Sequence, residues 1–245
     1  MNLKNRTVLI TGGTSGIGLE LVNTLAPVNN EIIVIGRNTA VLEELTRKYS
    51  NVASYECSLN SRSDVEQIIG RIVANHPDLS VVINNAGIQE TPTFLGSDFQ
   101  FDSIEKEITI NLMAPIWICA LVFRHFLKQE NHTAFINVTS GLAIHPKTGS
   151  AVYCATKAGL RNFTRSFRYQ MENTNVKVFE AIMPLVDTPM TLGRGRKKIS
   201  AMAAAKALIE GVEKGKEDIY IGISRLIPLM TRISPSLMAK ILKAG

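Results

Sequence analysis

Short apolar stretches alternate with longer helical patterns from one end of the sequence to the other. The β-branched stretches predict seven strands, at Thr7–Ile10, Ile32–Ile35, Val52–Tyr55, Val81–Ile83, Ala134–Val138, Val176–Ile182 and Ile219–Ile221. Apolar residues at helical spacing predict helices at Ile17–Ala26, through Val41, Leu42 and Leu45, around Val65–Ile72, and near 104–127, 152–171 and 201–212. Strands that are apolar on both faces are typical of parallel sheets covered by helices on both sides. We therefore expect an α/β fold in which residues 1–245 form one doubly wound domain, with a mostly parallel seven-stranded sheet and helices on both faces.

The composition argues against several classes of protein. With 45% hydrophobic residues the chain can bury a substantial core, so disorder is not expected. The net charge of +6 comes with 6% aromatic residues and no recognised motif, so we expect no nucleic-acid partner. Cys57, Cys119 and Cys154 are odd in number and lack metal-ligand spacing, which predicts reduced thiols in a cytoplasmic protein and no metal site. We expect neither a signal peptide nor a membrane span, because no uninterrupted run reaches the roughly 18 apolar residues that a span needs.

A glycine-rich turn joins the first predicted strand to the first predicted helix. Glycine lets a backbone turn sharply and lie close against a pyrophosphate, while the helix N-terminus offers free N–H groups and the positive end of its dipole. At this place in a doubly wound sheet, the turn predicts a dinucleotide site with contacts from Gly12, Thr14, Ser15, Gly16, Ile17 and Gly18.

The end of the second predicted strand favours one dinucleotide over the other. An acidic residue there would bond the adenosine ribose hydroxyls and repel a 2′-phosphate. This chain has Gly36 followed by Arg37, whose guanidinium suits a phosphate. NADP(H) is therefore favoured, and NAD(H) stays open as the alternative. The alternative interpretation of Arg37 is a solvated loop arginine that contacts no ligand.

Tyr153 and Lys157 stand four residues apart on one face of a predicted helix. A phenol titrates near pH 10, so as an acid or base at neutral pH it needs a nearby cation, which Lys157 could supply. Ser140 follows the fifth predicted strand, at the edge of the sheet where such folds bind ligands. Asn111 is a poor helix former within an apolar helix, which indicates that its side chain or local backbone has another task.

Taken together, these motifs resemble those of the short-chain dehydrogenase/reductase family, over essentially the whole chain. The match consists of the glycine turn, Asn84-Asn85-Ala86-Gly87, Asn111, Ser140, Tyr153 and Lys157, in the family's order and approximate spacing. The resemblance implies a Rossmann-type domain in which Tyr153 exchanges a proton and Ser140 polarises the carbonyl. It also implies that Lys157 holds the ribose and lowers the tyrosine pKa, and that Asn111 maintains a water relay to Lys157. Further cofactor contacts are implied for Ser58, Leu59, Asn85, Ala86, Gly87, Val186 and Thr188.

The sequence departs from the family's pattern at three positions. Met183 and Pro184 replace the proline and glycine that usually follow the sixth strand, and Pro184 lacks an N–H and has a fixed φ. Ser58 stands where many members have an aspartate that contacts the adenine. Val186-Asp187-Thr188 and Ile233-Ser234-Pro235 resemble the DltE-like subgroup, which brings no settled substrate.

Residues 189–200 form a short, basic segment where the family usually covers its substrate. Its cations would suit an anionic small molecule or a carrier-linked substrate, although a solvated loop explains them equally well. The tail has apolar residues at helical spacing, Leu226, Leu229, Met230, Ile233, Leu237 and Ile241. We expect these apolar side chains to pack against the sheet or another subunit. Contact with a membrane is the less favoured alternative. The resemblance also implies a homo-dimer or homo-tetramer.

The expected function is hydride transfer between NADP(H) and a carbonyl or secondary alcohol substrate, with Tyr153 as general acid and base. The alternative is a non-catalytic sensor or scaffold that binds the dinucleotide without turnover. The presence of Ser140, Tyr153 and Lys157 together argues for the enzyme.

Overall fold

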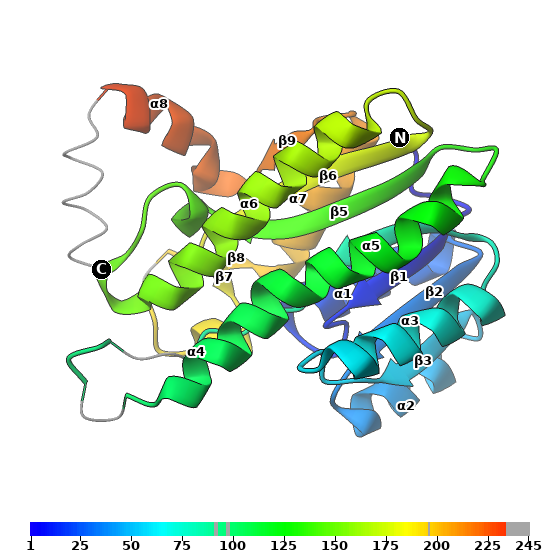
Figure 1. Ribbon diagram of the computed structural model, residues 1–245, viewed down its shortest axis with the longest axis horizontal. Helices are drawn as coiled ribbons and strands as arrows, with labels where there is room; N and C mark the ends of the chain where they lie inside the picture. The colour runs from blue at the N-terminus through cyan, green and yellow to red at the C-terminus, as the bar shows by residue number, and fades with distance from the viewer. Residues whose placement is uncertain (91–92, 97–98, 196, 234–245) are drawn as a thin grey trace.

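A seven-stranded, fully parallel sheet forms the centre of the computed structural model, which describes residues 1–90, 93–96, 99–195 and 197–233 (Figure 1). The strand order is β3-β2-β1-β4-β5-β6-β9. The strands are β1 (Thr7–Thr11), β2 (Glu31–Gly36), β3 (Val52–Glu56), β4 (Leu79–Asn84), β5 (Thr133–Ser140), β6 (Val176–Met183) and β9 (Asp218–Tyr220). All seven overlap the stretches predicted from the sequence, so the expected α/β fold is confirmed.

Helices cover both faces of this sheet, and each face has its own apolar cluster. On one side lie α1 (Gly16–Leu25) and α2 (Thr39–Lys48), which pack near β1 and β2, and α7 (Ala201–Glu213), which packs on α1, β6 and β9. On the other side lie α3 (Arg62–Asn75), α5 (Ala114–Leu127) and α6 (Ala151–Met171) (Figure 1). Because both strand faces are buried, the strands are uniformly apolar, as the sequence pattern indicated.

The strand order reverses between β1 and β4, which lie side by side although α1, β2, α2, β3 and α3 separate them in the chain. In doubly wound sheets, ligands bind outside the carboxyl ends of the strands at this switch point. The topology therefore brings together the turn after β1 and the segments that follow β4, β5 and β6.

The long helix expected near 104–127 is not a regular α-helix. It consists of α4 (Phe101–Ile108), a π-helical turn (Thr109–Met113) and α5, and Asn111 lies within the π-helical turn. A π-turn inserts one residue into the helical repeat and is often found at functional sites. The helix continues through this turn, so the predicted long helix is confirmed, but an apolar period does not reveal a local change from i→i+4 to i→i+5 hydrogen bonding.

The same helical stretch, Phe101–Leu127, is long and apolar enough to cross a membrane, judged by length and composition alone. However, Ala114, Ile118, Val122 and Phe126 face the sheet within the core of the fold. The apolar character of this stretch is thus explained by packing on the sheet.

Short elements complete the chain after β5. The 3₁₀ turns η3 (Gly141–Ala143) and η4 (Thr148–Ser150) precede α6. After β6, β7 (Val186–Asp187) pairs with β8 (Ile199–Ser200) in a small second sheet that the sequence did not predict, and η5 (Pro189–Thr191) lies between them. The 3₁₀ helix η6 (Gly222–Leu226) leads into α8 (Ile227–Ile233). The end of the apolar tail, with Leu237 and Ile241, lies outside the described residues, as do Ser234, Pro235 and Arg196.

Candidate active site

A cavity of about 1120 Å³ opens at the carboxyl ends of the central strands. It is larger than the roughly 300–1,000 Å³ typical of a pocket for one small ligand. Its walls include almost every site residue expected from the sequence: Gly12, Thr14, Ser15, Gly16, Ile17, Arg37, Ser58, Leu59, Asn85, Ala86, Gly87, Ser140, Tyr153, Lys157, Val186 and Thr188. Gly18 and Asn111 lie behind this wall and support it from outside the cavity.

The glycine turn is shaped so that its backbone forms the cavity surface. Gly12 has a φ of +67°, and a Cβ there would lie 2.9 Å from the Cα of Ala86. Gly16 has a φ of +51°, and its Cβ would lie 2.9 Å from Cγ2 of Thr188. Gly18 does not line the cavity, but a Cβ there would collide with the carbonyl oxygen of Gly12. This contact explains why glycine is needed at position 18. Side chains would fill this cradle, so the turn fits a close-lying pyrophosphate.

The N-terminus of α1 lacks the side-chain cap found at α2, α3 and α7. In those helices the side chains of Asn38, Ser61 and Ser200 accept hydrogen bonds from backbone N–H groups of the first turn. Ser15, the residue before α1, makes no such bond and lines the cavity instead. The first N–H groups of α1 are therefore available to an anion, as expected of a phosphate site.

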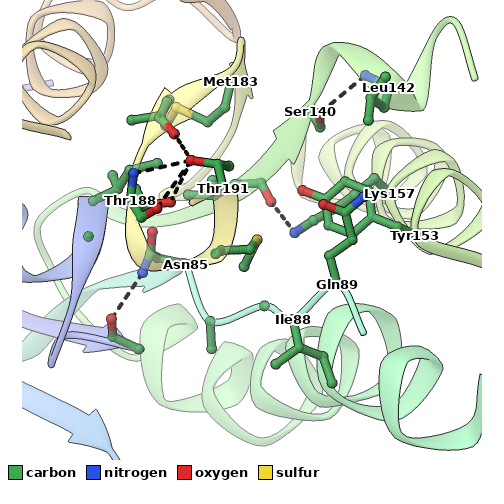
Figure 2. A pocket seen from close by; sticks show the side chains of 18 of the residues that line it. Asn85, Ile88, Gln89, Ser140, Leu142, Tyr153, Lys157, Met183, Thr188 and Thr191 are labelled. Atoms are coloured by element: carbon green, nitrogen blue, oxygen red, sulfur yellow. Dashed lines mark hydrogen bonds between the residues drawn. The ribbon is translucent and has the colours of Figure 1, made fainter. Parts of the chain in front are cut away.

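Asn85 and Thr11 connect the two strands at the switch point. The Asn85 side-chain amide donates to the carbonyl oxygens of Thr11 (3.0 Å) and Gly12 (3.3 Å), and Figure 2 draws one of these bonds. The Thr11 hydroxyl in turn accepts from the backbone N–H groups of Asn85 (3.1 Å) and Ala86 (3.0 Å). These bonds fix the glycine turn against the segment after β4, so Asn85 shapes the site as well as lining it.

At the end of the cavity that follows β2 and β3, Arg37 is exposed at the cavity edge, two residues before α2 begins. Gly36 is needed beside it, because a Cβ there would overlap the Thr14 side chain. Ser58 is exposed and its hydroxyl accepts from the Asn60 N–H (3.4 Å), while Leu59 is buried with a φ of +56°. The exposed Arg37 guanidinium could bind a 2′-phosphate, and with a glycine at position 36 no acidic side chain is present there to repel it.

Tyr153 and Ser140 meet on the opposite side of the cavity. The Ser140 hydroxyl lies near the Tyr153 phenol and accepts a hydrogen bond from the Leu142 N–H (3.1 Å). Burial raises the pKa of Tyr153 to about 12, and the nearby Ser140 hydroxyl lowers it only in part. The phenol is therefore protonated at neutral pH and can donate a proton to an oxygen atom of a ligand. The nearby Ser140 hydroxyl can donate a hydrogen bond to that same ligand oxygen.

Lys157 lies one helical turn further along α6 and is almost fully buried. Its ammonium donates to the Val138 carbonyl oxygen (2.9 Å) and lies 5.8 Å from the centre of the Tyr153 ring (Figure 2). Burial lowers the pKa of Lys157 to about 8, against an opposing influence from the Glu107 carboxylate. At neutral pH the ammonium form still predominates, so a cation adjoins the phenol.

Asn111 uses its whole side-chain amide to hold the segment after β4. Its Oδ1 accepts from the Ile88 N–H and its Nδ2 donates to the Ile88 carbonyl oxygen, each at 2.8 Å. The same Nδ2 donates to the Thr156 hydroxyl at 3.3 Å. Asn111 thus links the π-turn, the cavity wall and α6, which accounts for a polar side chain in an apolar helix.

Thr191 is a site residue that the sequence analysis missed. Thr188 and Thr191 form a reciprocal capping box around η5, in which the Thr191 hydroxyl accepts from the Thr188 N–H (3.2 Å). The Thr191 hydroxyl also donates to the Val186 carbonyl oxygen (2.6 Å). Threonines three residues apart before a turn are a visible capping signal. Figure 2 shows this pair across the cavity from Ser140, Tyr153 and Lys157.

The unusual Met183-Pro184 pair is accommodated without disrupting the segment. β6 runs to Met183, which pairs with Ser140, and the chain enters β7 at Val186. The Leu185 carbonyl then accepts from the Ile199 N–H (3.2 Å), a bond that needs no donor at Pro184. Val186 and Thr188 therefore reach the cavity as the sequence predicted.

Gln89, which carried no recognisable sequence signal, and Arg194, from the basic segment near 189–200, also line the cavity. They belong to segments more than a hundred residues apart, and only the fold shows that they meet. Within the described part of the chain, no group of three or more acidic, histidine or cysteine side chains could hold a metal ion.

Comparison with known proteins identifies the family. A model of the short chain dehydrogenase family matches residues 6–198. The uncharacterized oxidoreductase DltE of Bacillus subtilis is 37% identical over 225 residues, covering 89% of each chain, which confirms the predicted likeness to the DltE-like subgroup.

Solved structures share the fold. A short chain dehydrogenase from Burkholderia cenocepacia in complex with NADP has a TM-score of 0.87 at 21% identity, covering 99% of each chain. A short-chain dehydrogenase from Sphingobium yanoikuyae in complex with NADPH has a TM-score of 0.81 at 22% identity, covering 98% of this chain and 97% of that one. Together with the family match over most of the sequence, these findings show that the chain belongs to the short-chain dehydrogenase family.

Proposed function

We propose that this protein is an NADP(H)-dependent oxidoreductase that interconverts a carbonyl compound and a secondary alcohol, with Tyr153 as general acid and base. The observation that carries the proposal is the meeting of Ser140, Tyr153 and Lys157 in one cavity with the glycine turn. The family match supports the reaction class, since its members are oxidoreductases.

In the reduction direction, the substrate oxygen would lie between the Ser140 hydroxyl and the Tyr153 phenol. Both groups can donate a hydrogen bond to that oxygen, which polarises the carbonyl. As negative charge develops, Tyr153 gives up its proton, and the Lys157 ammonium stabilises the resulting phenolate. When bound, the dinucleotide would supply the hydride in this direction and accept it in the other.

We assign the cofactor contacts from the walls of the cavity. The glycine turn and the first turn of α1 would hold the pyrophosphate, Arg37 the 2′-phosphate, and Ser58 and Leu59 the adenine. Asn85, Ala86 and Gly87 would lie along the ribose, with Val186 and Thr188 beside the nicotinamide carboxamide. Asn111 would position Lys157 through Ile88 and Thr156, in addition to any water relay.

We infer one dinucleotide-binding unit over residues 1–245, whose segment near 189–200 covers the substrate side. The free thiols of Cys57, Cys119 and Cys154 fit a cytoplasmic protein. Exposed apolar side chains on α5 and α6, among them Leu121 and Tyr169, support a homo-oligomer formed through these helices.

The test is a fluorescence titration of the pure protein with NADPH and NADH, followed by a carbonyl substrate screen with NADPH. Tight NADPH binding with turnover of a ketone or aldehyde is the expected result. Binding without turnover of any carbonyl compound would favour the sensor alternative, and binding of neither nucleotide would overturn the proposal.

A further inference from the structure

The substrate side of the cavity has a wall of apolar side chains that water can reach. Ile223 is 71% exposed and Leu226 is 49% exposed, and both line the cavity together with Ile227 and Met230. Exposed apolar side chains that converge on a concave site indicate contact with an apolar part of a ligand. We call Ile223, Leu226, Ile227 and Met230 the apolar wall.

The apolar wall is fixed close to the reacting groups. The position that a Cβ would take on Gly141, the residue after Ser140, lies 2.6 Å from Cδ1 of Ile227. His145 and Thr231 form a hydrogen bond of 2.6 Å between the loop after η3 and α8. A ligand atom bound at Ser140 would therefore have the apolar wall beside it.

A guanidinium stands at the same end of the cavity. Arg194 donates to the Gln89 side-chain oxygen (2.6 Å) and to the Gln89 carbonyl oxygen (3.1 Å). The Gln89 amide donates in turn to the Ser150 hydroxyl (2.5 Å), one turn of α6 before Tyr153. This chain of bonds holds Arg194 near the Tyr153 phenol. The positive charge of Arg194 lowers the pKa of that phenol.

Among the described residues, the hydrogen-bond partners of Arg194 are neutral. No ion pair between described residues includes Arg194 or Lys147, which also lines the cavity, while the buried Glu107 carboxylate acts on Tyr153 and Lys157. The nearby carboxylate of Glu90 pairs with Lys106 at 2.6 Å. An anionic group bound here would find a positioned guanidinium with N–H groups suited to a carboxylate or a phosphate.

We propose that the substrate is an amphipathic carbonyl compound, with an aliphatic chain against the apolar wall and an anionic group bound by Arg194. This inference rests on the proposed function and specifies its substrate class. The anion can be a carboxylate on the substrate itself or a phosphate on a carrier to which the acyl chain is attached, and both would use the same guanidinium.

The test compares NADPH-dependent reduction of four compounds by the intact protein. They are a long-chain oxo-carboxylate, its methyl ester, its coenzyme A thioester and a short neutral ketone. We expect kcat/KM for an anionic compound to exceed that for the ester by roughly 10- to 100-fold, as for a charge-assisted hydrogen bond. Preference for the carboxylate or for the thioester identifies the source of the anion.

Two variants address the guanidinium. Arg194→Gln removes its charge, and Gln89→Glu places a carboxylate on it while retaining the geometry of the bond. Each should reduce the anion-to-ester ratio of kcat/KM towards one. Arg47→Gln is the matched control, because Arg47 is an exposed arginine on α2 that does not line the cavity, and the ratio should stay at the wild-type value.

A third variant addresses the apolar wall. Leu226→Ala should lower kcat/KM for the long-chain compounds relative to the short ketone by roughly tenfold or more, because several methylene contacts are lost. NADPH titration of each variant checks that the cofactor site has folded.

The outcomes separate this inference from the proposed function. Turnover of the ester and the short ketone as efficiently as the anions, with no effect of Arg194→Gln, would overturn the inference and leave the proposed function standing. NADPH binding without turnover of any of the four compounds would overturn both.

Discussion

The Lys157 ammonium lies 5.8 Å from the centre of the Tyr153 ring, one helical turn away on α6, while Ser140, at the end of β5, lies near the Tyr153 phenol. The phenol is thus placed between two groups. The Ser140 hydroxyl can hydrogen-bond the substrate oxygen to which the phenol would give its proton, and the Lys157 ammonium can stabilise the resulting phenolate. The proposed chemistry depends on this arrangement more than on any single group.

Replacing the phenol tests the arrangement most directly. Tyr153→Phe keeps the ring but removes the proton that would be transferred, so kcat should fall by about 10²- to 10⁴-fold. The dissociation constant for NADPH, measured by fluorescence titration, should change little by comparison. A variant that keeps near-normal kcat would refute the assignment of Tyr153.

Burial of Lys157 predicts a specific pH dependence of stability. Because its pKa is about 8 in the folded protein against 10.5 for the free side chain, the unfolded state binds more protons between these values. Lys157 should therefore make the free energy of unfolding rise as the pH is raised from about 8 to about 10. Tyr153 opposes this at higher pH, since its folded pKa of about 12 exceeds the ordinary value of 10.

Urea unfolding of wild type and Lys157→Met at pH values between about 7 and 10 measures this contribution. The rise in unfolding free energy should be larger in the wild type than in the variant. Lys216→Met, at an exposed lysine, is the control and should keep the wild-type rise. Equal slopes for wild type and Lys157→Met would contradict the predicted shift.

The role of Arg37 is tested through the nucleotide preference. Arg37→Asp replaces a cation that would bind the 2′-phosphate with an anion that would repel it and could bond the ribose hydroxyls. The ratio of the dissociation constants for NADH and NADPH should fall by about 10- to 100-fold. Arg47→Asp makes the same change on the surface of α2 and should leave the ratio as it is. An unchanged ratio in Arg37→Asp would show that this arginine is a solvated loop residue.

Removal of the Asn111 amide should affect both stability and turnover. In Asn111→Ala the buried N–H and carbonyl of Ile88 lose their partners, which costs about 1–3 kcal/mol for each group. Because the same amide bonds Thr156 next to Lys157, kcat should fall as well, while Asn30→Ala, at an exposed asparagine, should change neither. Wild-type unfolding free energy in Asn111→Ala would contradict the role described for this amide.

Much of the fold could be predicted from periodicity, because both faces of the sheet are buried and its strands are correspondingly apolar. The glycine turn and the Tyr153–Lys157 pair were also readable, since each depends on neighbours in the chain. Other features depend on tertiary contacts: the π-turn at Asn111 leaves no change in the apolar period, and the two-residue strands β7 and β8 are too short for a pattern. The Arg194–Gln89 contact joins residues 105 positions apart, which no local signal encodes.

The bond from Lys157 to the carbonyl of Val138 ties α6 to β5 only two residues before Ser140. The groups proposed for proton transfer are thereby held by the central sheet, whereas η6, α8 and the segment after Thr188 line the cavity from outside that sheet. If the proposed function holds, substitutions in these outer segments would change the preferred carbonyl substrate while Tyr153 and Lys157 keep their relative positions.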